Sequence, residues 1–403
     1  MVRRWLLLGG LGMLVGPCTG IAGERVARES AEATLRKAVA FFRQQVSVRG
    51  GYLWQYSADL TLREGEGKAA ETTAWVQPPG TPSVGQAYLD AYRLTGDAYL
   101  LEAAREAAEA LILGQLRSGG WDYRIEFDPS VRKKVAYRAD GDDAKGQNTS
   151  TLDDDTTQAA LRFMMNVDRE LKFQDERLHE AVMFGLDSLL RVQYPNGAWP
   201  QRFVEPPDPA KFPVRKAAYP DSWSRTYPKT DYREFYTFND NTIADTIATM
   251  LEAARIYGDG RYQQAAEKAG DFIILAQMPD PQPAWAQQYD ANMCPAWARR
   301  FEPPAITGGE SQGVLRTLMT LYRNTGNRKY LEPIPRAIQY LKVSRLGDGR
   351  LARFHELRTN KPLYFTKQYE LTYDSSDMPT HYAFIVGSQL DSMEAAYQQL
   401  STS

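Results

Sequence analysis

The sequence predicts an all-α protein, an (α/α) toroid or incomplete barrel, because one helical hairpin pattern occurs four times. In each copy a helix stops at a short polar turn, and a second helix returns with apolar residues at helical spacing. Repeated helix pairs form solenoids or rings because a single pair cannot bury its apolar face. The four copies occupy residues 91–115, 168–193, 251–277 and 321–343.

The connections within the pairs are short, whereas those between the pairs are long. Three of the short turns contain Gly followed by Asp or Asn, at Gly96, Gly258 and Gly326. The long connections must all emerge at one end of the helix array, and loops of this length in a compact domain are usually functional. We therefore expect the functional residues at that end, with small β-hairpins such as residues 362–365.

The two ends of the chain add one predicted helix each, at 27–46 and 387–400. Residues 1–23 contain two arginines, a short apolar run and small residues at the end, which is typical of a signal peptide. We expect a secreted protein, periplasmic or extracellular, in which residues 24–403 form a single toroid domain and a monomer. Cys294 is then the one cysteine of the mature chain, and no internal disulfide is expected.

Composition argues against several classes of function. The net charge is −2 and no basic run occurs, so neither nucleic acid nor an anionic membrane is an expected partner. Three histidines are present, and His179 fits an outer helix as a surface or packing residue. The sequence offers no His or Cys cluster of the zinc type. It also lacks a Ser-His or Cys-His pairing that would favour nucleophilic acyl transfer.

Two acidic clusters stand where a long connection meets the next inner helix. Asp153, Asp154 and Asp155 precede one helix, and Asp240 with Asn241 precedes another. Helix capping explains one Asp or Asn at such a place. Three consecutive aspartates exceed what a cap requires, and a cation would relieve their repulsion. Because calcium prefers oxygen ligands in loose geometry, the clusters predict a Ca²⁺ site.

The long connections also carry basic and aromatic side chains. Any one of these basic residues fits a solvated surface charge, but their concentration at one end of the array favours binding. Arginine recognises carboxylates through paired hydrogen bonds, and aromatic rings stack on sugar faces. An acidic polysaccharide held partly through calcium is the predicted partner. The residues are Arg299, Arg300, Arg353, Arg358, Lys361 and Lys367, with Trp121, Trp199, Trp285, Trp297 and Tyr364.

Five motifs, in order along most of the mature chain, resemble the pectate lyases of polysaccharide lyase family 10. They are LDDDTTQAALRF, YPNGAWPQRF, TFNDNTIADTI, PAWARRFEPPAITGGESQGVLRTLM and RFHELRTNKPLYF. The resemblance implies an (α/α) toroid catalytic domain and calcium-assisted β-elimination on polygalacturonate, the backbone of pectin.

The resemblance also implies roles for individual residues. The calcium-linked aspartates fall on Asp153 and Asp240, with the register between Asp153 and Asp154 left open, and the catalytic base falls on Arg299, with neighbouring Arg300 as the alternative. A neutral arginine is unusual, and we expect calcium and surrounding basic residues to lower its pKa. Expected substrate contacts are Asn241, Arg353, Lys361, Lys367, Trp199 and Glu310.

Two other functions fit the same sequence. Toroids also host inverting glycoside hydrolases, which need two carboxyl groups separated by room for a water, and Asp154 with Glu310 could supply them. Such an enzyme would be independent of calcium and give saturated products. A periplasmic oligouronide-binding protein would use the same residues without turnover. We rank lyase first, hydrolase second and binding protein third.

Overall fold

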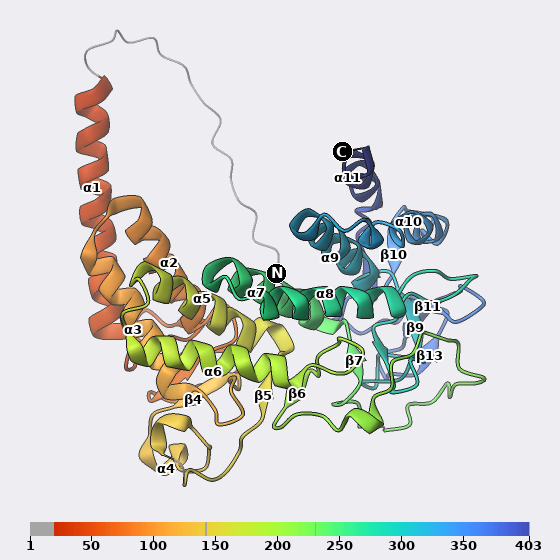
Figure 1. Cartoon of the computed structure of the whole chain (residues 1–403), viewed down its shortest axis with the longest axis horizontal. Coiled ribbons are helices and arrows are strands. Elements are labelled where there is room, and N and C mark those ends of the chain that lie inside the picture. Colours follow the sequence, from red (N-terminus) through yellow and green to blue (C-terminus); the bar gives the residue numbers. More distant parts are fainter. Residues whose placement is uncertain (1–19, 142, 230, 403) are drawn as a thin grey trace.

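The computed structural model describes residues 20–402 apart from positions 142 and 230. Residues 1–19 of the predicted signal peptide lie outside the described residues. The four predicted hairpins are confirmed as four pairs of helices (Figure 1), and the connection in the fourth pair contains a 3-10 turn at Arg328–Tyr330. The pairs are α2 (Thr81–Thr95) with α3 (Ala98–Gly114), α5 (Thr156–Glu170) with α6 (Glu176–Val192), α7 (Thr242–Tyr257) with α8 (Gly260–Leu275), and α9 (Glu310–Thr325) with α10 (Ile334–Val343).

The helices form an incomplete toroid. The first helix of each pair contacts the first helix of the next, so α2, α5, α7 and α9 form an inner row and their partners pack outside. Helix α1 (Gly20–Phe41), extended by a π turn at Phe42–Val46, and helix α11 (Leu390–Thr402) lie at opposite ends of the array (Figure 1). A short helix, α4 (Pro129–Arg132), lies in the loop after α3. None of the described helices has the length and apolar character needed to cross a membrane.

The repeated Gly-Asp turn explains why each pair folds back on itself. Gly96 ends α2 with φ +73°, and Gly258 ends α7 with φ +69°, a left-handed conformation that glycine adopts without strain. The next residue caps the returning helix: Asp97 accepts a hydrogen bond from the Tyr99 N–H at 3.0 Å, and Asp259 from the Arg261 N–H at 2.9 Å. Each dipeptide thus ends one helix and starts another.

Short antiparallel strands lie in the long connections. A four-stranded sheet has the order β13 (Leu371–Thr372), β12 (Pro362–Phe365), β11 (Phe354–Glu356), β9 (Ala305–Thr307), and it confirms the strand predicted at 362–365. The pairs are β1 (Gln55–Tyr56) with β2 (Arg63–Glu64), β3 (Thr73–Trp75) with β4 (Arg124–Glu126), β5 (Ser150–Thr151) with β6 (Arg202–Phe203), β7 (Tyr236–Thr237) with β8 (Gln288–Tyr289), and β10 (Leu351–Ala352) with β14 (Ile385–Val386).

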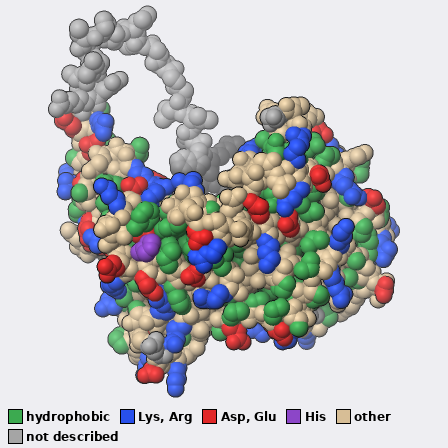
Figure 2. Space-filling view, in the orientation of Figure 1, with side chains coloured by type: hydrophobic (Ala, Val, Ile, Leu, Met, Phe, Trp, Pro, Cys, Tyr) green, Lys and Arg blue, Asp and Glu red, His purple; other side chains and the backbone are tan. Residues whose placement is uncertain are grey.

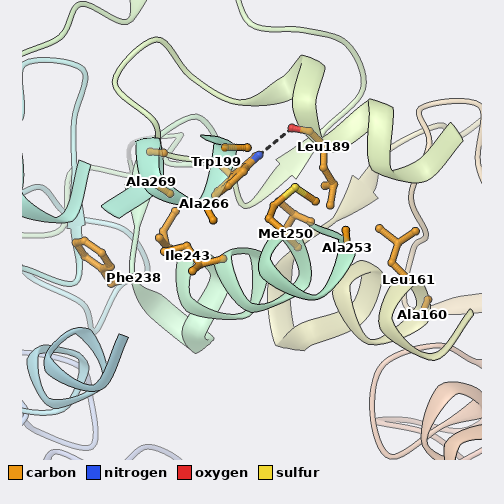
Figure 3. Close-up of a cluster of buried hydrophobic side chains, with 14 of the residues drawn as sticks. Ala160, Leu161, Leu189, Trp199, Phe238, Ile243, Met250, Ala253, Ala266 and Ala269 are labelled. Atoms are coloured by element: carbon orange, nitrogen blue, oxygen red, sulfur yellow. Dashed lines mark hydrogen bonds between the residues drawn. The ribbon is translucent and has the colours of Figure 1, made fainter. Parts of the chain in front are cut away.

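Three tryptophans predicted to face sugars belong to the core instead. Trp199 is 0% exposed, and its Nε1 donates to the Leu189 carbonyl at 2.8 Å (Figure 3). Trp121 and Trp285 are equally buried and bond the carbonyls of Leu111 and Ile273 in the same way. The prediction that Trp199 binds substrate is therefore wrong. Its indole is buried and bonds the long connection after α6 to α6 itself.

Truncating a core side chain tests this packing. Leu161 on α5 is 0% exposed, whereas Leu94 on α2 is 80% exposed and serves as the matched control (Figure 3 shows Leu161). Leu161→Ala should lower the free energy of unfolding by about 2 to 5 kcal/mol, since it leaves a cavity. Leu94→Ala should change it by less than about 0.5 kcal/mol. Urea denaturation followed by circular dichroism measures both, and equal losses would contradict the assigned core.

Candidate active site

The candidate active site begins with two identical turns at the N-terminal ends of the inner helices. Residues Asp153–Asp155 precede α5 and Asn239–Asn241 precede α7. Their backbones agree closely, with φ 49° and ψ 36° at Asp154 and φ 47° and ψ 35° at Asp240. Asp154 and Asp240 are therefore equivalent positions in successive repeats. Asp and Asn tolerate this left-handed conformation better than most residues.

The two turns bring three carboxylates together. One oxygen from each of Asp153, Asp154 and Asp240 can be chosen so that all lie within 4.8 Å of one another. Neighbouring side chains hold them: Gln201 Nε2 donates to Asp153 Oδ1 at 2.9 Å. Gln77 Nε2 donates to Asp154 Oδ2 at 2.9 Å. The cluster thus contains the three predicted metal ligands, and Asp153 and Asp154 both belong to it.

Burial and the neighbouring carboxylates raise the pKa of two of the carboxyl groups. Burial, followed by the charges of Asp153 and Glu66, raises the pKa of Asp154 to about 6. Burial, followed by Asp153 and Asp154, raises the pKa of Asp240 to about 7. Asp240 keeps a surface open to solvent, so an ion can reach it. Oxygen-only donors that repel one another suit a hard cation such as Ca²⁺.

Arg299 faces this cluster, and Arg300 does not. A cavity of about 220 Å³ is lined by Asp153, Arg202, Tyr232, Arg299 and Glu302 among others. Arg300 is exposed, and its Nη2 donates to the Gln368 carbonyl at 2.8 Å. The ambiguity between the two adjacent arginines is thus resolved by the direction of their side chains.

Glu302 fixes the position of Arg299. The Glu302 carboxylate is 1% exposed; its Oε1 accepts from Arg299 Nη2 at 2.6 Å and its Oε2 from the Arg299 N–H at 2.9 Å. Gln287 Nε2 donates to the same Oε1 at 2.6 Å. One buried carboxylate therefore holds both the guanidinium and the backbone of Arg299.

The same contact corrects the expected electrostatics. Burial disfavours the charged guanidinium, but the Glu302 carboxylate outweighs burial and raises the pKa of Arg299 above its usual value. The expectation that surrounding basic residues lower this pKa is wrong for the ion-free protein, because the closest charged group is acidic. Asp240 acts in the same direction as Glu302.

Arg353 and Glu310 form a second charged pair beside the cluster. Arg353 Nη1 binds Glu310 Oε1, and Arg353 Nε donates to the Ala383 carbonyl at 2.7 Å. The Thr307 hydroxyl donates to the other Glu310 oxygen. Burial opposes the charge of Arg353, yet Glu310, Tyr382 and Asp240 together raise its pKa. Glu310 is thus neutralised by a partner and does not stand free as an acid or a base.

The remaining predicted residues are more scattered. Asn241 lies beside Asp240 at the start of α7 and is exposed. Lys361 lies at the turn between β11 and β12, with Nζ 5.3 Å from the centre of the Tyr373 ring. Lys367 pairs with Asp377 at 3.1 Å. In the part of the chain that the structure describes, no hydrogen bond or ion pair joins either lysine to the three aspartates.

Sequence reasoning missed Glu302 and three further residues of this site. The Tyr123 hydroxyl donates to Asp153 Oδ2 at 2.8 Å, and the guanidinium of Arg202 lies 5.7 Å from the centre of the Tyr123 ring. The Tyr382 ring lies between Arg299 and Arg353, 5.7 and 4.6 Å from their guanidinium carbons. Arg202 stands inside the motif YPNGAWPQRF, which could have signalled it, whereas no spacing pattern points to Tyr123 or Tyr382.

Two solved structures with a similar fold come from Cellvibrio cellulosa. One is an aspartate-to-alanine variant of a Family 10 polysaccharide lyase in complex with trigalacturonic acid: TM-score 0.54, 21% identity, 79% of this chain and 98% of that chain covered. The other is described as a Family 10 polysaccharide lyase: TM-score 0.51, 21% identity, 79% of this chain and 97% of that chain covered. At this identity they show a shared fold.

Sequence comparison gives the family. A search of curated proteins finds no match. Residues 115–350, more than half of the chain, match the model of a family described as pectic acid lyase. The protein therefore belongs to the pectic acid lyase family and is a polysaccharide lyase.

Proposed function

We propose that the protein is a pectate lyase, which cleaves α-1,4-polygalacturonate by calcium-assisted β-elimination and releases 4,5-unsaturated oligogalacturonides. The observation that carries this proposal is that Arg299 lines one cavity with Asp153 of the three-aspartate cluster, and its charge also acts on Asp154 and Asp240. Family membership supports the reaction, and the trigalacturonic acid bound to a lyase of the same fold supports the substrate. We further propose that residues 1–23 are removed on secretion, and that residues 24–403 act as one monomeric domain.

Asp153, Asp154 and Asp240 would hold the calcium ion. When bound, the ion supplies positive charge that stabilises a uronate carboxylate while the proton at C5 is removed. Arg353, oriented by Glu310 and the Ala383 carbonyl, is the protein's own partner for a substrate carboxylate. Arg353 lies close enough to Asp240 for the charge of that carboxylate to raise the pKa of Arg353.

Arg299 is the proposed base. Its neutral form takes the proton from C5, the electron pair forms the C4–C5 double bond, and the C4–O bond breaks, with the leaving oxygen protonated by water. Because Glu302 raises the pKa of Arg299, the neutral form is scarce at neutral pH. The rate should therefore rise with pH in the alkaline range. The hydrolase alternative gains no support, since Glu310 is paired with Arg353.

The arginine pair provides the test of this proposal. With calcium and polygalacturonate, Arg299→Ala should lower the growth of ultraviolet absorbance from the new double bond by about 10²- to 10⁴-fold, the usual contribution of a general base. Arg300→Ala should stay within about threefold, since its exposed charge is directed away from the cavity. Circular dichroism checks folding of both. If Arg299→Ala keeps its activity, the base is another group.

Replacing Glu302 tests its positioning role. Glu302→Gln should lower kcat by about 10- to 100-fold and leave KM nearly unchanged, because Arg299 is misplaced while substrate carboxylates bind elsewhere. The alkaline rise in rate should also move to lower pH, since the carboxylate that raises the pKa of Arg299 is gone. Glu356→Gln is the control, because Glu356 is another buried glutamate, paired with Arg225 at 2.5 Å.

Glu356→Gln should reduce stability but preserve kcat. Equal kcat losses in the two glutamine variants would mean that Glu302 is a structural residue only.

Calcium binding should depend on pH in a defined window. Below about pH 5 Asp154 and Asp240 carry protons and compete with the ion, whereas above about pH 8 both are ionised and repel each other until calcium binds. The raised pKa values mean that the ion-free protein loses stability as pH rises through about 6 to 7. The gain in Tm on adding calcium should therefore increase from pH 5 to pH 8.

Differential scanning calorimetry measures this gain. A hundredfold excess of calcium over its Kd stabilises the folded protein by about 2.7 kcal/mol. Asp240→Asn should lose most of the gain. A gain that is the same at every pH, or unchanged in Asp240→Asn, would place the ion elsewhere.

A further inference from the structure

A second cavity adjoins the candidate active site. Its volume is about 750 Å³, and it shares Arg202, Asp231 and Arg233 with the cavity that contains Arg299. Residues 202–208, which form β6 and the loop after it, line one part, and Asp231, Arg233 and Glu234 before β7 line another. Because the two cavities share lining residues, they lie side by side, and we expect a bound polymer to extend from one toward the other.

Carboxylates outnumber basic side chains in the lining of the second cavity. Its lining contains four acidic side chains and three basic ones. One of the basic residues, Arg233, is already paired with Asp231 at 2.5 Å. Another, Arg202, has Nη2 3.5 Å from the Tyr123 hydroxyl, a neutral partner that does not offset its positive charge.

Three of the acidic side chains form no ion pair with any described residue, namely Glu205, Asp208 and Glu234, and all three are exposed. Lys211 and Arg202 are the two basic residues of the lining without an ion pair to a described residue. The unpaired carboxylates therefore outnumber the unpaired cations by three to two. Figure 2 shows acidic and basic side chains interspersed over the visible face of the molecule.

The contrast with the first cavity decides what can bind. There, the cluster of Asp153, Asp154 and Asp240 suits a cation that would offset the charge of a uronate. Across residues 20–402, with positions 142 and 230 left aside, no second group of His, Cys, Asp or Glu has metal-ligand spacing. An ionised uronate in the second cavity would therefore face an excess of carboxylates, Glu205 and Glu234 among them, without a bridging ion.

Apolar surface is available in the same place. Val204 is 50% exposed on the lining, and Pro206 and Pro207 follow it. A methyl ester has no charge and presents an apolar group to such a surface.

We propose that the second cavity binds further units of the substrate chain and selects units whose carboxyl group is methyl-esterified over units whose carboxyl group is ionised. This inference rests on the proposed function for the identity of the substrate. The enzyme would then cleave at a free galacturonate held in the first cavity and accept methyl-esterified units in the second cavity.

The test uses galacturonate oligomers of one length, either fully de-esterified or partly methyl-esterified, at fixed calcium and low salt. The wild type should show the higher kcat/KM on the partly esterified oligomer. The double variant Glu205→Gln with Glu234→Gln should raise kcat/KM on the de-esterified oligomer by about 3- to 10-fold and change the other by less than about twofold. The gain should shrink at high salt, because exposed charges are screened.

A matched double variant, Glu176→Gln with Glu332→Gln, removes two exposed carboxylates elsewhere and should change neither value. An unchanged ratio in the Glu205 and Glu234 variant, or weaker cleavage of the de-esterified oligomer, would overturn the inference. Binding of both oligomers by calorimetry separates this inference from the proposed function. Tighter binding of the esterified oligomer without a new double bond supports the cavity's selectivity and overturns the lyase reaction.

Discussion

The mutual repulsion of three carboxylates is the constraint on which the rest of the site depends. Asp153, Asp154 and Asp240 meet because two inner helices begin with the same left-handed turn, and the helix N-termini and the donors Gln77, Gln201 and Tyr123 hold them in place. These neutral donors do not offset the carboxylate charges, and burial together with the neighbouring aspartates raises the pKa of Asp154 and Asp240. The toroid therefore maintains a repulsive cluster that a cation would stabilise.

Glu302 has two opposing effects on Arg299, the proposed base. Glu302 places the guanidinium in the cavity, and the same contact holds its proton more tightly. The elimination needs a neutral arginine, but the carboxylate that positions Arg299 also stabilises its protonated form. A cation among the aspartates acts in favour of proton loss, because it offsets the charge of Asp240, which also raises the pKa of Arg299.

Local signals in the sequence predicted most of the fold. Gly96 with Asp97 and Gly258 with Asp259 end one helix and cap the next, so the hairpins could be found without tertiary information. The aspartate cluster was predictable because two similar motifs precede two inner helices. Trp199 was not predictable, because its indole reaches a carbonyl ten residues earlier and turns a loop tryptophan into a core residue. Adjacent Arg299 and Arg300 differ only in tertiary contacts, which sequence spacing does not report.

The most direct measurement is ultraviolet absorbance of the purified wild-type protein mixed with polygalacturonate, with calcium, with magnesium and with a chelator. The account predicts that absorbance from a new carbon-carbon double bond grows with calcium and stops with the chelator. Reducing ends released without any such absorbance would contradict it, because bond cleavage would then be hydrolytic and not an elimination with Arg299 as the base.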